Sequence, residues 1–416
     1  MLLIVWDVNI INRTNRQKEC IQNWLKSGAR STLVLPTGFG KTRIGLMIIS
    51  SFVKRDPTFR VLIVVPTQVI KDQWLNLIIK NQLFTNCEVE IINTVIKKKW
   101  ECDLMIQDEC HAFAANTYKS VFESVSYTYL LCLTATIERL DGKHEIILQY
   151  APIADKITVE EAVANNWLSD YREYKVLIDV DNIEEYNIIN QNFINYFSYF
   201  NYDFNFAMKM AIDPKTRYSY CKKSGLNPKA VTAMAFDWSN CMRKRKAFVM
   251  SHPKKFEIAN KIIEHRPNAK IITFSATIKD TELIKYGQTL HSGKTKKKNR
   301  ITLEEFNEVK SGVLNSAKSL IEGVDVKGLN TAIIISGNSS SRQKVQSIGR
   351  VVRYEEGKIA EIFTLVIKGT VEESWYNNAS TTNYITIDEN ELDIVLKTGS
   401  IELRTTENIK NINYRF

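Results

Sequence analysis

The chain has 416 residues, of which 44% are hydrophobic and 25% charged, and a net charge of +10. This composition is ordinary for a globular protein of two or three domains, and the positive charge indicates a polyanionic partner, nucleic acid first. The seven cysteines form no C-x-x-C pair, and no apolar stretch is long enough to span a bilayer. We therefore exclude a membrane protein and expect a monomeric cytoplasmic or nuclear protein without an export signal, or a viral or phage protein acting in its host cell.

The first elements along the chain are a helix, a strand, a glycine turn and a second helix. Residues 16–25 have amphipathic helical spacing, and the apolar run at residues 32–35 predicts a strand. Residues 36–42 then read PTGFGKT, and residues 44–49 resume apolar spacing of helical type. A strand, a glycine turn and a helix in this order are typical of a phosphate-binding loop.

The chemistry of this turn points to a nucleotide. Its two glycines permit positive φ and bring successive N–H groups to a phosphate, while the next helix adds the positive end of its dipole. In such a turn Lys41 reaches the β and γ phosphates, and the Thr42 hydroxyl binds Mg²⁺. The usual fingerprint has a glycine where this chain has Leu35, so a chance glycine turn is the alternative. The predicted nucleotide cradle is Pro36, Thr37, Gly38, Phe39, Gly40, Lys41 and Thr42.

Three further apolar runs, at residues 61–65, 103–106 and 129–133, predict strands, and polar residues follow each of them. These residues are Thr67 after the first run, Asp108, Glu109 and His111 after the second, and Thr134 and Thr136 after the third. Two carboxylates at the end of a buried strand are costly unless a cation lies nearby, and a magnesium nucleotide supplies one. Because ligands of open parallel α/β sheets bind at the carboxyl ends of the strands, these residues should line one crevice.

The middle of the chain has a different texture. Residues 186–206 are rich in aromatic residues and asparagine, and a basic cluster follows at residues 243–246. One interpretation is a helical insertion that lies on nucleic acid, with basic residues on phosphates and aromatic residues on bases. The other is that the aromatic residues form a small separate core and the basic residues are only solvated. We favour the second for the aromatic residues and leave both open for the basic cluster.

The second half repeats the strand pattern and adds a pair of arginines. Residues 269–274 and 331–336 predict strands, and Ser275 ends the first of them. Residues 291–300 are lysine-rich and predict an exposed loop that either contacts phosphates or is merely solvated. The series Gln346, Arg350 and Arg353 has the spacing Gln-x-x-Gly-Arg-x-x-Arg, which places the three on one helix face. Two arginines so placed can stabilise a transferring phosphate, and two surface arginines are the alternative.

In this order, the segments resemble the motifs of superfamily 2 helicases and translocases of the DExH type. The stretch LTATIERLDGKH is similar to the branch that contains XPB-like and phage branch-migration helicases. The resemblance implies an α/β fold of two tandem RecA-like domains, each a parallel sheet flanked by helices, with a helical, aromatic-rich insertion between or within them. The predicted boundaries are 1–168 for the first domain, 169–250 for the connecting segment, 251–376 for the second domain and 377–416 for a polar tail.

The resemblance also implies roles for individual residues. The catalytic residues would be Lys41, Asp108, Glu109, Gln346, Arg350 and Arg353, with Thr42 and Asp108 at the Mg²⁺. The nucleotide would be bound by residues 36–42 with Gln17, Gly323 and Asp325. Gln17 would read the adenine, and an exposed polar helix residue is the alternative for it. Residues that couple the nucleotide to nucleic acid would be Thr67, His111, Thr134, Thr136 and Ser275.

These expectations combine into a motor. We predict an ATP-dependent helicase or translocase, with ATP and Mg²⁺ in the cleft between two lobes, that moves on DNA, 3′-to-5′, on duplex or branched substrates. An RNA-directed DExH remodeler is the first alternative, because the sequence does not distinguish the two polymers. A nucleic-acid-binding scaffold without hydrolysis is an alternative of another class.

Overall fold

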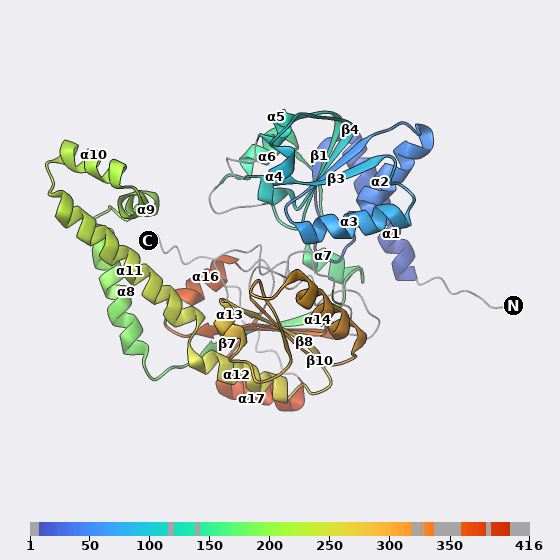
Figure 1. The fold of residues 1–416 in the computed structure, drawn as a ribbon. Coiled ribbons are helices and arrows are strands. Elements are labelled where there is room, and N and C mark those ends of the chain that lie inside the picture. Colours follow the sequence, from blue (N-terminus) through green and yellow to red (C-terminus); the bar gives the residue numbers. More distant parts are fainter. Residues whose placement is uncertain are drawn as a thin grey trace.

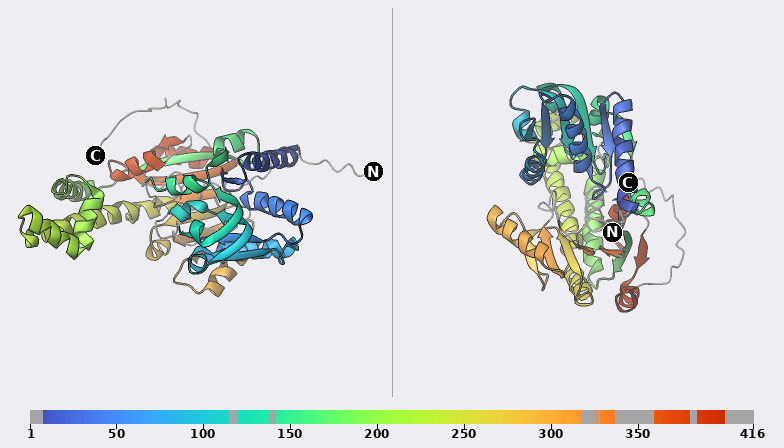
Figure 2. Two further views of the ribbon diagram at one scale, coloured as in Figure 1. Left: turned by 90° about the horizontal axis from the view of Figure 1, so that it is seen from above. Right: turned by 90° about the vertical axis from the view of Figure 1, so that its right-hand side faces the viewer.

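The computed structural model consists of two α/β lobes, one above the other, and a helical arm that projects from the second lobe (Figure 1). It describes residues 8–114, 120–137, 142–317, 326, 328–336, 359–379 and 384–399. Among these residues, no helix has the length and apolar character that crossing a bilayer requires. The two lobes face each other across their adjoining edges, and the arm extends well beyond both of them in Figure 1 and in the view from above (Figure 2, left).

Lobe 1 is built on a parallel sheet of six strands in the order β3-β2-β4-β5-β1-β6. The strands are β1 (Arg30–Val34), β2 (Val61–Val65), β3 (Cys87–Ile91), β4 (Trp100–Asp108), β5 (Val125–Thr134) and β6 (Ile153–Lys156). The helices are α1 (Val8–Lys26), α2 (Lys41–Arg55), α3 (Gln68–Lys80), α4 (Ile92–Val95), η1 (Cys110–Ala114), α5 (Val121–Ser124), α6 (Glu145–Tyr150) and α7 (Val159–Ala164). The residues of β2 are all apolar and buried, because helices and connecting segments cover both faces of the sheet.

Lobe 2 is built on a parallel sheet of seven strands in the order β13-β7-β12-β11-β8-β10-β9. The strands are β7 (Asp170–Ile178), β8 (Lys270–Ser275), β9 (Gln288–Leu290), β10 (Gly312–Ala317), β11 (Thr331–Ile334), β12 (Ile359–Ile367) and β13 (Ile385–Ile387). The helices are α12 (Pro253–Glu264), α13 (Ile278–Thr281), α14 (Lys296–Glu308), α16 (Val371–Ala379) and α17 (Glu389–Thr398). Two tandem parallel sheets with helices around them confirm the predicted fold class.

Elements of lobe 2 lie on both sides of residues 251–376, the range predicted for the second domain. Strand β7 comes before the arm and pairs along its whole length with β12, while β13 comes near the end of the chain and also pairs with β7. Helix α17, in the predicted tail, buries Leu392 and Val395 completely in the core of this lobe. Its start is fixed by a capping box between Asp388 and Glu391. The places of β7 and β13 in the sheet depend on pairing between distant segments, which local sequence patterns do not reveal.

The lysine-rich stretch at residues 291–300 is only partly the exposed loop that we predicted. Helix α14 begins at Lys296, where the Thr295 side chain accepts a hydrogen bond from the backbone N–H of Lys298. The helix packs through Phe306, which is buried, and leaves Lys296 and its two lysine neighbours exposed. The prediction was therefore wrong for residues 296–300, because a threonine cap allows even a strongly basic segment to start a helix.

The arm is a helical insertion within lobe 2, between β7 and α12. Its helices are α8 (Ile183–Ser198), α9 (Phe204–Ile212), α10 (Pro214–Ser224) and α11 (Pro228–Met250). Trp238 is fully buried at the centre of a small core, with Phe193 and Phe197 stacked on its ring at 6.0 and 5.6 Å between centroids. This confirms the interpretation of the aromatic residues as a separate core. In the basic cluster, Arg245 lies over Phe193 at 4.1 Å, whereas Lys244 and its basic neighbours are exposed.

The two lobes are joined by an apolar contact as well as by the chain. Helix α7 lies between them (Figure 1). Trp167, a few residues further on, packs edge-on against Phe39 of lobe 1 with 5.4 Å between ring centroids. The same apolar cluster continues into lobe 2 through Ile272 and Ile362. The segment that joins the two lobes therefore contacts Phe39 through Trp167, and Phe39 belongs to the predicted nucleotide cradle.

Candidate active site

The predicted site residues of lobe 1 meet at the carboxyl edge of its sheet. Strands β1, β5 and β4 are neighbours, and their register pairs Val34 with Thr134 and Asp108 with Leu133. All three strands therefore end at the same level. The glycine turn leaves β1, the two carboxylates leave β4, and the threonine loop leaves β5 at one edge, as the rule for parallel α/β sheets predicts.

The glycine turn has the backbone that its sequence demands. Gly38 and Gly40 have φ of 91° and 107°, a region that L side chains rarely adopt. Gly40 is the cap residue of α2, so Lys41 and Thr42 lie in the first turn of that helix. A Cβ at position 40 would also lie 2.6 Å from Nε2 of Gln17. Any side chain at Gly40 would therefore strain the backbone and displace Gln17.

Helix α1 holds the turn from the other side. The Nε2 amide of Gln17 donates to the Phe39 carbonyl at 2.8 Å, and Nε of Arg13 donates to the same oxygen at 3.1 Å. Arg13 also donates to the Gly38 carbonyl. Gln17 is completely buried, so the alternative of an exposed helix residue was wrong, while its role with adenine stays a prediction. The contacts of Arg13 were not predicted, although the resembled family carries an arginine close to this position, one turn before the glutamine.

Lys41 and Glu109 form an ion pair across the crevice, with Nζ and Oε1 3.2 Å apart. Within the described part of the chain, the ammonium of Lys41 is buried and makes no hydrogen bond. A lysine has three donors, so this one has unused capacity for an anion. Glu109 has a φ of 51°, an uncommon conformation for a residue with a side chain, and it turns the chain sharply at the end of β4.

Asp108 is buried and held by two donors. The indole Nε1 of Trp74 donates to its Oδ2 at 2.8 Å, and the backbone N–H of Glu109 donates to its Oδ1 at 3.0 Å. Burial raises the pKa of Asp108 to about 6, and the neighbouring Glu109 carboxylate adds to the rise, while Lys41 and the indole oppose it. A carboxylate that is costly to ionise in isolation is suited to a site that receives a cation.

A chain of polar contacts leads from Glu109 to the threonine loop. Nδ1 of His111 lies 3.5 Å from Oε2 of Glu109 and 3.0 Å from the hydroxyl of Thr134. That hydroxyl donates its single proton to the Thr136 carbonyl at 2.7 Å, so Nδ1 of His111 must be the donor to it. The buried hydroxyl of Thr136 has no hydrogen-bond partner among the described residues. Three of the five residues predicted to couple the site to nucleic acid, His111, Thr134 and Thr136, are thus joined to Glu109.

The remaining predicted residues fall into two groups. Thr67 is the cap of α3, and its hydroxyl accepts from the Ile70 N–H at 3.4 Å. Ser275 ends β8, a central strand of lobe 2, and its buried hydroxyl is without a hydrogen-bond partner in the described ranges. The other predicted residues lie outside the described residues, namely Gly323, Asp325, Gln346, Arg350 and Arg353. The structure therefore joins Gln17 to the glycine turn, and Lys41, His111 and Thr134 to Glu109, while the hydrogen bond described for Thr67 is within its own helix.

The assembled donors fit a magnesium nucleotide. Lys41 offers an ammonium with free donor capacity, and the buried hydroxyl of Thr37 makes no hydrogen bond within the described residues. The turn and the start of α2 provide backbone N–H groups and a helix N-terminus for phosphate. Asp108 and the Thr42 hydroxyl supply the hard oxygen ligands that Mg²⁺ prefers in addition to phosphate oxygens. The residues present thus suit ATP and Mg²⁺ together.

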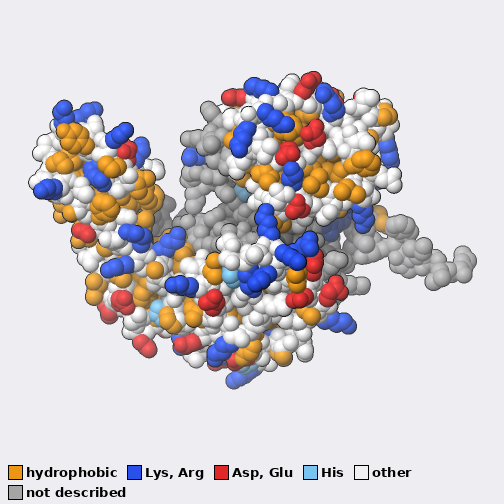
Figure 3. Space-filling model, in the orientation of Figure 1, with side chains coloured by type: hydrophobic (Ala, Val, Ile, Leu, Met, Phe, Trp, Pro, Cys, Tyr) orange, Lys and Arg blue, Asp and Glu red, His pale blue; other side chains and the backbone are white. Residues whose placement is uncertain are grey.

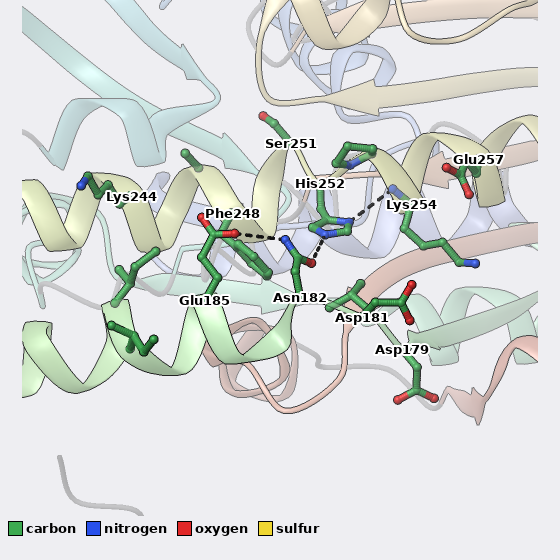
Figure 4. A pocket seen from close by; sticks show the side chains of 15 residues that line it. Asp179, Asp181, Asn182, Glu185, Lys244, Phe248, Ser251, His252, Lys254 and Glu257 are labelled. Carbon is green, nitrogen blue, oxygen red and sulfur yellow. Dashed lines mark hydrogen bonds between the residues drawn. The ribbon is translucent and has the colours of Figure 1, made fainter.

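A separate cavity of about 920 Å³ lies at the base of the arm, between α8, α11 and the start of α12 (Figure 4). There Nε2 of His252 is hydrogen-bonded to Oδ1 of Asn182 at 2.9 Å, and Nδ1 of His252 accepts from the Lys254 N–H at 3.3 Å. Its lining includes Asp181 and Glu185 and no residue of the glycine turn. This cavity is therefore distinct from the crevice at the carboxyl edge of the lobe 1 sheet.

Two tandem parallel sheets, with a glycine turn and a carboxylate pair at the carboxyl edge of the first, define a RecA-like fold of two lobes. The family model "Type III restriction enzyme, res subunit" matches residues 10–100 and 92–139, and "Helicase conserved C-terminal domain" matches residues 254–355. The chain belongs to superfamily 2 of the helicases and translocases. Members of this superfamily hydrolyse ATP, so the protein is an ATP hydrolase that acts on nucleic acid, and the non-hydrolysing scaffold is excluded.

Two relatives agree with this assignment. The chain is 27% identical over 381 residues to "DNA 3'-5' translocase XPB2" of Sulfurisphaera tokodaii, covering 86% of this chain and 82% of that protein. It is 22% identical over 364 residues to "Putative ATP-dependent RNA helicase L396" of Acanthamoeba polyphaga mimivirus, covering 80% of this chain and 60% of that protein. The first of these alignments runs through both lobes, because it spans most of each chain.

Solved structures support the fold. The Pyrococcus furiosus Hef helicase domain matches with a TM-score of 0.51 at 16% identity, over 88% of this chain and 97% of that one. Dbp5 of S. cerevisiae, in a structure with RNA and ADP BeF3, matches with a TM-score of 0.59 at 12% identity, over 92% of this chain and 91% of that one. At these identities the likeness concerns the arrangement of the two lobes alone.

Proposed function

We propose that the protein is a DNA translocase or helicase that moves 3′-to-5′ by hydrolysing ATP with Mg²⁺ in the cleft between its lobes. The observation that carries the proposal is the similarity to the archaeal DNA 3'-5' translocase, which extends over 86% of this chain and 82% of that protein. The net charge of +10 supports a polyanionic track. On the face shown in Figure 3, Lys and Arg side chains gather where lobe 2 faces lobe 1.

The geometry of lobe 1 suggests how its residues act on ATP. Lys41 neutralises Glu109 in the present arrangement, with 3.2 Å between Nζ and Oε1. A triphosphate in the turn would compete for the ammonium, and Lys41 would then neutralise phosphate oxygens instead of Glu109. The Glu109 carboxylate would accept the proton of the attacking water as general base. In this scheme the arrival of the nucleotide itself strengthens the base.

Asp108 and Thr42 would hold Mg²⁺ against the phosphates. When bound, the metal neutralises charge on the β and γ phosphate oxygens. Asp108 enters this role with its carboxylate fixed by Trp74 and by the Glu109 N–H. Gln17 and Arg13 keep the turn in place through the Phe39 carbonyl, and Gln17 would in addition read the adenine.

The polar chain from Glu109 would transmit the state of the nucleotide. His111 and Thr134 connect the general base to the loop that ends at Thr136, through contacts of 3.5, 3.0 and 2.7 Å. Gln346, Arg350 and Arg353 of lobe 2 would close over the γ phosphate, as the motif resemblance implies, with Gly323 and Asp325 near the ribose. Closure by ATP and opening after hydrolysis would move the two lobes in alternation along the strand.

A stimulation assay tests this proposal. ATP hydrolysis is measured with no polymer, single-stranded DNA, duplex DNA, a branched junction and RNA, and direction is read from displacement of streptavidin from either end of a DNA strand. We expect DNA to stimulate most and displacement to occur from the 5′ end, which an enzyme moving 3′-to-5′ approaches. Stimulation by RNA alone, or displacement from the 3′ end only, would contradict the proposal.

An RNA-directed remodeler is the second candidate. The observation in its favour is the mimivirus relative, whose name gives it as a putative ATP-dependent RNA helicase, at 22% identity over 80% of this chain. The same assay separates the two candidates when DNA and RNA compete. If unlabelled RNA suppresses DNA-stimulated hydrolysis at equal concentration, while DNA does not suppress the RNA-stimulated reaction, the second candidate replaces the first.

A further inference from the structure

Trp74 makes a contact with the active site that its place in the sequence does not suggest. It lies in the middle of α3, the helix that follows Thr67, and its side chain is almost fully buried. Its indole N–H donates to Oδ2 of Asp108 at 2.8 Å. The donor thus reaches from the outer layer of lobe 1 to the carboxylate assigned to Mg²⁺.

Together with the backbone, Trp74 fixes the orientation of that carboxylate. Oδ2 of Asp108 receives the indole proton, and Oδ1 receives the Glu109 N–H at 3.0 Å. Each oxygen of an ionised carboxylate has a second lone pair available. Donors on both oxygens hold the plane of the group, so the free lone pairs point in set directions before a cation arrives.

The indole itself has little freedom to move. A Cβ at Gly45 of α2 would lie 2.7 Å from Cη2 of Trp74, so the ring rests directly on the backbone of the helix that begins with Lys41. From its position in α3, Trp74 therefore contacts both α2 and the end of β4. This placement explains why a glycine occupies an interior position of α2, where it would otherwise cost about 1 kcal/mol relative to alanine.

We propose that Trp74 is a positioning residue, whose indole N–H orients the Asp108 carboxylate for the metal ion of the ATPase reaction. The inference rests on the proposed function, in which Asp108 is a metal ligand. Groups that hold a metal ligand from behind commonly change metal affinity by about 10- to 100-fold when they are removed. Trp74 does not touch ATP in this proposal and acts only through Asp108.

Trp24 provides a matched control. It is also fully buried in the same apolar cluster of lobe 1, and its indole N–H donates to the Leu130 carbonyl at 2.9 Å. Trp24→Phe removes an indole hydrogen bond and ring atoms from the same core, as Trp74→Phe does. The difference between the two variants therefore isolates the bond to Asp108 from the general cost of losing a buried indole.

The experiment measures metal affinity without turnover. Mn²⁺ is titrated into wild type, Trp74→Phe and Trp24→Phe in the presence of saturating ADP, and free Mn²⁺ is read by electron paramagnetic resonance. We expect the Kd for Mn²⁺ to rise about 10-fold or more in Trp74→Phe and to stay within about 2-fold of wild type in Trp24→Phe. Gly45→Ala, which displaces the ring and keeps the indole, should weaken Mn²⁺ binding in the same direction and covers the case in which Trp74→Phe does not fold.

The outcomes are distinct. Unchanged Mn²⁺ affinity in Trp74→Phe, or an equal loss in both tryptophan variants, would overturn the positioning role and leave the proposed function in place. Failure of wild type to bind Mn²⁺ with ADP would overturn the inference at its foundation. If that failure is accompanied by normal ATP hydrolysis, the assignment of Asp108 as a metal ligand is wrong. If hydrolysis is absent as well, the proposed function falls with it.

Discussion

The two lobes each contain a buried lysine paired with a glutamate, and the pairs differ in how completely they are satisfied. In lobe 2, Lys255 and Glu372 are 2.6 Å apart with side chains 0% and 3% exposed. Lys255 also donates to the Ile335 carbonyl at 2.9 Å, and Glu372 accepts from the Ile367 N–H at 3.0 Å. The charges of this pair are therefore neutralised by one another and by the backbone.

The pair in lobe 1 is looser. Lys41 and Glu109 are 3.2 Å apart with side chains 9% and 19% exposed, and the ammonium makes no hydrogen bond to any described residue. A fully bonded buried pair is difficult to improve by adding a ligand, whereas an ammonium with unused donors gains by meeting a phosphate. The two ion pairs therefore differ in hydrogen bonding as well as in burial, and the proposed function assigns the less completely bonded pair to the nucleotide.

The strongest test of this comparison is Lys41→Ala. We expect ATP turnover to fall to background, because Lys41 begins the helix that follows the glycine turn and its ammonium lies 3.2 Å from Glu109. The unfolding midpoint should change less than in a variant of the lobe 2 pair, since Lys41→Ala breaks a partly exposed ion pair with Glu109 but removes no hydrogen bond of Lys41. Turnover is measured by phosphate release and stability by thermal unfolding. Wild-type turnover in this variant would remove the proposed pocket.

Glu109→Gln should separate binding from cleavage. A glutamine keeps the shape of the side chain and cannot accept a proton as a base, so we expect nucleotide binding to persist and hydrolysis to fall by about 10²- to 10⁴-fold. Binding is followed with a fluorescent ATP analogue and cleavage in a single-turnover assay. If binding disappears as well, the carboxylate supports the structure of the site instead of acting in the reaction.

The pair in lobe 2 should show the opposite response. Lys255→Met leaves Glu372 buried without its partner, which we expect to cost about 3–5 kcal/mol in the free energy of unfolding. The remaining folded fraction should retain the wild-type KM for ATP. Chemical denaturation gives the first quantity and steady-state kinetics the second. A Lys255→Met variant of wild-type stability but altered KM would contradict this distinction, because the lobe 2 pair would then affect the nucleotide and not the fold.

The pH dependence should follow Asp108, whose pKa burial raises to about 6. Because the folded carboxyl holds its proton to a higher pH than the unfolded one, this group favours the folded state at low pH, and that contribution falls as pH rises through about 4 to 6. Metal binding needs the ionised form, so kcat/KM should fall several-fold between pH 7 and 5.5. Raising the Mg²⁺ concentration should move this fall in kcat/KM to lower pH. If the fall does not respond to Mg²⁺, a group other than Asp108 causes it.

The smallest effect concerns the lysines at the start of α14. Replacing Lys296, Lys297 and Lys298, which are exposed, with glutamine should reduce the slope of log K against log salt for DNA binding by about 0.7 to 0.9 for each phosphate that is no longer neutralised. The matched control replaces the three exposed lysines at residues 97–99. They lie just before β4 begins, at the amino ends of the lobe 1 strands and away from the carboxyl edge that carries the site. Equal slopes for the two triple variants would remove α14 from the DNA track.

The sequence by itself determined the elements that carry the site. Apolar runs predicted the central strands, and the glycines of the turn predicted the positive φ at Gly38 and Gly40. Acidic and hydroxyl residues at strand ends predicted that Asp108 and Thr134 would lie at one edge, and their strands pair in that register. These features are local, because hydrophobic periodicity and the backbone freedom of glycine act within a few residues.

Only the tertiary structure decided which partners these residues meet. Trp74 is 34 residues from Asp108 in the chain, and Arg13 is 26 residues from Phe39, yet each forms a hydrogen bond that shapes the site. The same holds for α17, whose apolar residues read as part of a polar tail until β13 pairs with β7 and brings them into a core. Such contacts depend on strand order and helix placement, which form when distant segments pack, so no short stretch of sequence contains them.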